Sequence, residues 1–230
     1  MVLRQWADDT LAEALGREQR TDPVLPGSGG PAGNARLTAW TGLVLLVLFL
    51  VELGTLLDLR PLLDWHVVVG VLLVPPALLK TATTGWRIIR YYTNRPAYRA
   101  AGPPPMPLRL LGPLVVLCTL AVLGTGLALI AVGPTGGTTP FLSVAGMGVD
   151  VLVLHKATFV LWAVVTGVHT LARLAPAVRI VTTGRGVPGR GGRIAVQVLT
   201  ILVAVAAAVI VLRLSGAWLT GLPLRLGHHH

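Results

Sequence analysis

Apolar residues occur along this chain in long blocks separated by short polar connections, and they follow neither an alternating nor an amphipathic pattern. Each block holds about 20 residues or more, which is long enough for a helix to cross a hydrocarbon core about 30 Å thick. The blocks cover approximately residues 37–57, 63–87, 108–132, 149–181 and 194–214. The pattern therefore predicts an all-α integral membrane bundle with five transmembrane helices.

Three regions follow from these blocks. Residues 1–36 contain a short charged segment, WADDTLAEALGREQR, and a Pro/Gly-rich linker, and we expect a loosely ordered or surface-lying cytoplasmic tail there. Residues 37–214 form the transmembrane domain. Residues 215–230 are a C-terminal tail whose last three histidines look like the remnant of a purification tag.

Composition and charge support a membrane protein. The chain is 53% hydrophobic and only 12% charged, which excludes an ordinary soluble domain. Its net charge of +10 comes from arginines in short loops beside apolar blocks, so anionic lipid explains it better than nucleic acid. One cysteine, Cys118, cannot supply a disulfide framework or a multi-thiolate metal site.

The loops also predict an orientation. The connections after the second and fourth blocks each carry about five arginines, whereas the other two carry one and none. The positive-inside bias then places the N-terminus in the cytoplasm and the C-terminus outside, in a multi-pass protein. The excess of arginine over lysine, with abundant Ala, Val, Gly and Pro, favours a bacterial cell membrane.

Three histidines and one lysine within the apolar blocks carry the candidate chemistry. His155 and His169 are fourteen residues apart, which puts both imidazoles on nearly one helix face about 21 Å apart. The same step from His66 in the second block reaches Lys80. Because these two blocks run in the same direction, His66 and His155 share a depth near the outer leaflet, and Lys80 and His169 share one near the inner leaflet.

Neutral imidazoles from facing helices are common axial ligands of haem iron. Two histidines on one iron leave no position for a substrate, which favours electron transfer. We predict such a haem on His66 and His155. A second haem at His169 would use Lys80 if burial removes its proton, or His169 alone. The alternatives are a snorkelling Lys80 and histidines that make helix-packing hydrogen bonds.

Further residues have candidate roles around these ligands. Gly112 and Gly126, also fourteen apart, would let a porphyrin approach the third helix closely. Arg60 and Lys156 either neutralise haem propionates or are solvated interfacial charges. Glu52 lies within the first block, where it is either a proton acceptor at a quinol site or the partner of Arg60.

The histidine pattern resembles the membrane cytochrome b superfamily, including cytochrome b561-type subunits and respiratory cytochrome b, over about residues 37–175. In that superfamily a histidine pair on each of two helices holds two stacked haems within a four-helix core. The resemblance implies two b haems here, and one at minimum. Lys80 departs from the pattern where a fourth histidine is expected. The segment WHVVVGVLLVPPALLKTATTGWRIIRYY also resembles actinobacterial b-type segments that accompany extracytoplasmic molybdopterin oxidoreductases.

These observations predict electron transfer across the membrane, between a quinone pool or inner donor and an extracytoplasmic redox protein or domain. Membrane lipid is the surrounding partner, and the sequence leaves the oligomeric state open. One alternative is a cofactor-free transporter or anchor subunit, with Lys80 and a helix broken at Pro75 and Pro76 lining a substrate path. Another is a membrane enzyme that oxidises quinol at its own site. Bound haem separates the transporter from the other two.

Overall fold

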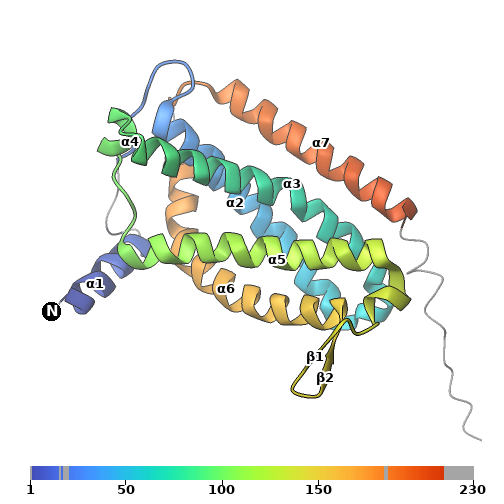
Figure 1. Ribbon diagram of the computed structural model, residues 1–230. Coiled ribbons are helices and arrows are strands. Elements are labelled where there is room, and N and C mark those ends of the chain that lie inside the picture. The colour runs from blue at the N-terminus through green and yellow to red at the C-terminus, as the bar shows by residue number, and fades with distance from the viewer. Residues whose placement is uncertain (1, 16, 18–20, 184–185, 215–230) are drawn as a thin grey trace, which may run out of the picture.

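The computed structural model describes residues 2–15, 17, 21–183 and 186–214, and these are almost entirely helical (Figure 1). The helices are α1 (Val2–Ala14), α2 (Gly30–Thr55), α3 (Leu59–Tyr92), α4 (Pro96–Ala100), α5 (Met106–Gly137), α6 (Val151–Thr183) and α7 (Arg190–Leu214), with a 3₁₀ turn at Leu56–Asp58. The all-α class predicted from the apolar blocks is confirmed. The predicted C-terminal tail, 215–230, lies outside the described residues.

Four helical stretches are long and apolar enough to cross a membrane. They are Gly30–Tyr92, Met106–Gly137, Val151–Thr183 and Arg190–Arg213. The prediction of a multi-pass helical membrane protein is confirmed to this extent. The first stretch has 63 residues and would be about 95 Å long as a straight helix, about three times the hydrocarbon thickness.

That first stretch is folded back on itself at the 3₁₀ turn. Near the turn, Glu52 of α2 contacts His66 of α3. Far from the turn, Asn34 of α2 donates to the Thr83 carbonyl of α3. As the contact position moves toward the N-terminus on α2, it moves toward the C-terminus on α3. The two helices therefore form an antiparallel pair.

Four helices close into a ring. α2 packs against α3 and α6, and α5 packs against the same two helices from the other side. The order around the ring is therefore α2, α3, α5, α6, with α3 diagonally opposite α6. Helix α7 lies outside this ring, against α3 and α2 (Figure 1). Side chains on α3 and α6 that point inward consequently meet in the middle of the bundle.

The middle of the ring is filled by apolar side chains. Two clusters of buried residues meet at Phe49: Leu45, Leu73 and Ala77 on one side, and Cys118, Trp162 and Val165 on the other. The Phe49 and Trp162 rings are 4.7 Å apart between centroids, and the Trp162 indole donates to the Thr119 hydroxyl at 3.2 Å. Trp162 is midway in sequence between the two histidines of α6, so this layer separates their two depths.

Three local features go beyond the sequence analysis. Gly133, with φ 72° and ψ 177°, interrupts α5 one residue after the predicted end of the third span at 132. The connection before α6 contains an antiparallel hairpin, β1 (Leu142–Val144) and β2 (Met147–Val149), for which the sequence analysis made no prediction. Helix α1 packs against α6 and α5, so this part of the N-terminal region lies on the surface of the bundle, one of the two arrangements expected for it.

Candidate functional site

His66 and His155 face each other across the bundle. They come from the diagonally opposed helices α3 and α6, so their rings meet between the flanking helices α2 and α5. The ring centroids are 6.3 Å apart and the ring planes are inclined by 78°. We call this pair the histidine level. It is the shared depth that the parallel direction of the second and fourth blocks predicted for these two residues.

Side chains from the end of α2 hold the His66 ring. Its Nδ1 lies 3.0 Å from the Thr55 hydroxyl and 3.0 Å from a carboxylate oxygen of Glu52. The hydroxyl hydrogen of Thr55 is already donated to the Glu52 backbone carbonyl at 2.6 Å. The Thr55 oxygen is then an acceptor toward the ring, so we assign the proton to Nδ1, and Nε2 keeps its lone pair.

Helix α5 holds the His155 ring in the same way. Its Nδ1 lies 3.1 Å from the hydroxyl of Thr125, and that hydroxyl donates its hydrogen to the Ala121 carbonyl at 2.8 Å. With the hydroxyl hydrogen on the Ala121 carbonyl, we assign the Nδ1 proton to the ring, and Nε2 then keeps its lone pair. Thr125 also contacts the Thr158 hydroxyl at 3.2 Å, one turn after His155.

The histidine level is thus able to bind a metal ion through both Nε2 atoms. A bond from imidazole nitrogen to a metal is about 2 Å long, so two rings on opposite sides of one ion have centroids about 6 Å apart. The observed 6.3 Å fits that separation, although a direct edge-to-face ring contact has a similar one. The anchored Nδ1 atoms favour ligation, because a ligating histidine typically donates its other nitrogen to an oxygen acceptor.

A glycine on α5 allows the close approach of α5 to His155. A Cβ atom added at Gly126 would lie 3.2 Å from Cε1 of the His155 ring. At Gly112, the other predicted cofactor contact, an added Cβ would meet no atom within 4 Å. Gly126 therefore belongs to the histidine level, whereas Gly112 lines open space one fourteen-residue step away.

Lys80 and His169 make up the second depth, which we call the lysine level. The Lys80 amine donates to the Thr38 backbone carbonyl of α2 at 3.3 Å, and an added Cβ at Gly42 would lie 2.7 Å from it. Within the part of the chain that the structure describes, Nδ1 of His169 is buried and has no hydrogen-bond partner.

Of the three charged candidates, Glu52 contacts the histidine level, whereas Arg60 and Lys156 do not. Glu52 contacts His66 and not Arg60, and its second carboxylate oxygen is buried without a partner among the described residues. Arg60 and Lys156 are both exposed. The proposed pairing of Glu52 with Arg60 is therefore wrong, since the helical hairpin turns the carboxylate toward the histidine.

Sequence reasoning missed the residues that hold the candidate ligands. Thr55 and Thr125 are short polar residues within apolar helices, and threonine is common there because its hydroxyl bonds to its own helix. Arg173 follows His169 by four residues, on the same helix face, and it forms a salt bridge with Glu13 of α1. The four-residue spacing from His169 was the one feature of the sequence that pointed to Arg173.

The described residues contain no cluster of three or more His, Cys, Asp and Glu side chains suited to a metal ion, although axial ligation of haem needs only two. The resemblance to membrane b-type cytochromes therefore depends on the histidine level itself. Comparison with models of known protein families, with curated proteins and with solved structures gave no match to this chain.

Proposed function

We propose that this protein is a five-span membrane cytochrome that binds haem b between His66 and His155 and carries electrons across the membrane. The observation that carries the proposal is the histidine level: two rings from opposed helices, each with Nδ1 held by oxygen acceptors and Nε2 free. A helix-packing histidine needs only one such hydrogen bond, and it needs no matching ring opposite.

Five crossings follow if each helix of the antiparallel α2–α3 pair spans the membrane separately. The loops between α3 and α5 and between α6 and α7 then lie at one end of the bundle, and they carry the arginines. The segment before α2 is held at that end, because Arg87 makes a two-bond salt bridge with Asp22, at 2.6 and 3.0 Å. By the positive-inside bias this end is cytoplasmic and the C-terminus is extracytoplasmic.

The chain's own residues would bind the cofactor and limit its chemistry. His66 and His155 would both hold the haem iron, which would favour electron transfer over oxygen or substrate chemistry. Thr55, Glu52 and Thr125 fix the ring orientations. Bound haem supplies reversible one-electron chemistry at iron, and the apolar layer around Trp162 keeps water from the bundle centre.

The remaining parts of the proposal depend on this site. A quinone and an extracytoplasmic redox protein are the proposed electron partners, with the free oxygen of Glu52 as a proton acceptor. A second haem at the lysine level would use His169, whose buried Nδ1 has no partner among the described residues. Haem stoichiometry tests this second site separately from the first.

The decisive experiment is a visible spectrum of the purified protein, oxidised and dithionite-reduced, with pyridine haemochrome quantitation. We expect reduced b-type bands, and the loss of one haem per chain in His66→Ala. A matched control is Trp65→Ala, which removes an exposed side chain next to His66 and should keep every haem.

Two other outcomes point elsewhere. The absence of haem, after haem supply during expression, would overturn the cytochrome and favour a cofactor-free transporter or anchor. Reduction of the purified protein by quinol, with turnover at its own site, would instead indicate a quinol-oxidising enzyme.

A further inference from the structure

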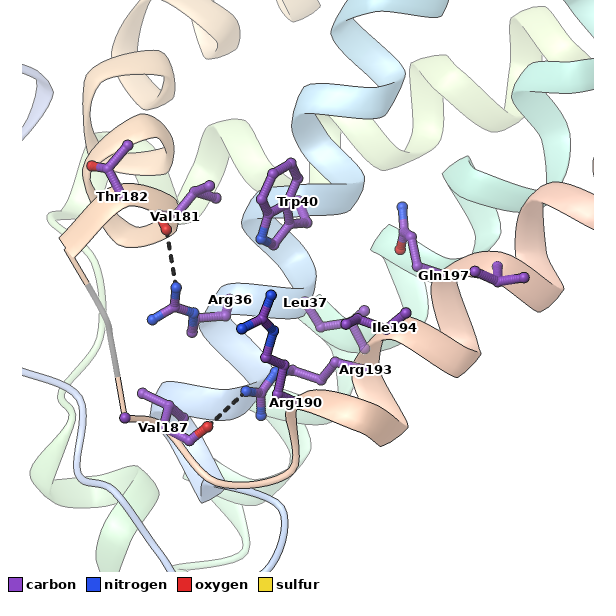
Figure 2. Close-up of a pocket in the computed structure, with 12 residues that line it drawn as sticks. Arg36, Leu37, Trp40, Val181, Thr182, Val187, Arg190, Arg193, Ile194 and Gln197 are labelled. Atoms are coloured by element: carbon purple, nitrogen blue, oxygen red, sulfur yellow. Dashed lines mark hydrogen bonds between the residues drawn. The ribbon is translucent and has the colours of Figure 1, made fainter.

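A cavity of about 630 Å³ opens between α2, α6 and α7 at the arginine-rich end of the bundle, away from the two histidines (Figure 2). Its polar lining includes three arginines and a glutamine. Its apolar lining consists of Leu37, Trp40, Val181, Val187, Ile194 and Val198. It therefore combines a cationic rim with an apolar wall.

Arg36 contributes an unused donor to this cavity. One of its terminal nitrogens donates to the Val181 carbonyl at 2.9 Å, which ties α2 to the end of α6 (Figure 2). The other, Nη1, is buried and finds no hydrogen-bond partner among the described residues. A buried guanidinium nitrogen without an acceptor is costly, so the cavity is suited to a ligand that brings one.

Two further arginines come from the start of α7. Arg193 donates to the backbone carbonyls of Val187 and Pro188, at 2.9 and 2.5 Å, and so shapes the loop that edges the cavity. Arg190 is exposed at the rim. Among the described residues, no carboxylate forms a salt bridge with Arg36, Arg190 or Arg193. The cavity thus gathers three positive charges that the described chain leaves uncompensated.

Gln197 adds a second unused donor. Its side-chain oxygen lies 3.1 Å from the Thr41 hydroxyl, which fixes the amide against α2. Its Nε2 is buried, again without a partner in the described part of the chain. The unsatisfied nitrogen of Arg36 can only donate, so the matching ligand is an acceptor. The uncompensated charge makes an anion the best acceptor.

From these contacts we propose that the cavity binds the phosphate of an anionic phospholipid, with an acyl chain along the apolar wall formed by Trp40 and its neighbours. Phosphate oxygens can accept from Arg36 and Gln197 together, and the exposed Arg190 adds attraction at headgroup depth. A free phosphate would satisfy the same donors but would leave the apolar wall uncovered. This inference does not depend on the haem proposal, because the cavity and the histidine level share no residue.

Native mass spectrometry of the full chain in detergent tests the proposal, with phosphatidylglycerol, phosphatidylcholine and inorganic phosphate as separate probes. We expect phosphatidylglycerol to bind in preference to phosphatidylcholine. Its Kd should rise about fivefold in Arg190→Gln, which removes one interfacial charge. In Arg36→Gln, which also removes a hydrogen bond to charge, the rise should be about tenfold or more. Arg213→Gln, an exposed arginine at the other end of α7, is the matched control and should bind as wild type does.

Equal binding of the two lipids, or an equal loss in Arg190→Gln and Arg213→Gln, would overturn the site. Inorganic phosphate binding as tightly as phosphatidylglycerol would overturn the lipid assignment. Arg36→Gln also removes the hydrogen bond that ties α2 to α6. The exposed Arg190 side chain makes no hydrogen bond to a described residue, so Arg190→Gln tests the site without that loss.

Discussion

The histidine level and the lysine level lie on the same two helices, and each pairs one residue of α3 with one of α6. At the histidine level, α2 and α5 each supply an oxygen acceptor that orients one ring. At the lysine level, α2 instead supplies a backbone carbonyl that binds the Lys80 amine, and Nδ1 of His169 has no acceptor among the described residues. Equal spacing along two helices therefore does not make equal sites, because the flanking helices decide how each side chain is held.

The largest expected effect separates the two levels directly. His155→Ala removes a proposed axial ligand, and we expect the loss of the haem bound there. His169→Ala should leave that haem and its reduced spectrum intact. Pyridine haemochrome quantitation on both variants measures the difference. Loss of the same haem in both variants would contradict a site confined to the histidine level.

The apolar layer between the levels should control the stability of both. Trp162 is 6% exposed, so Trp162→Ala opens a cavity in the bundle centre and should lower the free energy of unfolding by about 3–5 kcal/mol. The control is Trp65→Ala, because that side chain is 62% exposed. Thermal unfolding in detergent compares the two, and similar Tm values would show that the layer is not the core of the fold.

The hydrogen bonds at the histidine level should have a smaller effect. Thr125→Val removes the acceptor of His155 Nδ1 while keeping the side-chain shape, and it should weaken haem binding about 10–100-fold. Thr200→Val is the matched control, since the Thr200 hydroxyl donates to the Val196 carbonyl of its own helix and to no other described residue. Haem titration of the apoprotein gives both affinities. Equal haem affinities in the two variants would show that Thr125 does not orient the His155 ring.

The smallest expected effect concerns Lys80. Lys80→Met keeps the length of the side chain but leaves the Thr38 carbonyl without its donor. We expect the haem at the histidine level to be unchanged in amount and spectrum. If wild-type protein holds two haems per chain and this variant holds one, lysine is a ligand and the lysine level is a second haem site.

The sequence by itself determined the helical class, the positions of the long helices and the shared depth of His66 and His155. Apolar blocks of membrane length and a fourteen-residue step are local properties of the chain, and the helical rise converts them into length and depth. The predicted end of the third span at 132 matches the break at Gly133 for the same local reason. The docking of α1 and the hairpin before α6 were not predictable in this way, because their contacts join distant or weakly patterned segments.

Only the tertiary structure decided which side chains surround each candidate residue. Glu52 had two sequence interpretations, and the fold-back of α2 onto α3 placed it on His66 instead of Arg60. Thr55 and Thr125 carry no sequence signal, because their role depends on the packing of α2 and α5 beside opposed rings. The cavity at Arg36, Arg190 and Gln197 likewise joins residues more than 150 positions apart. Periodicity determines where along a helix a residue lies, whereas its chemistry depends on neighbours that come from other helices.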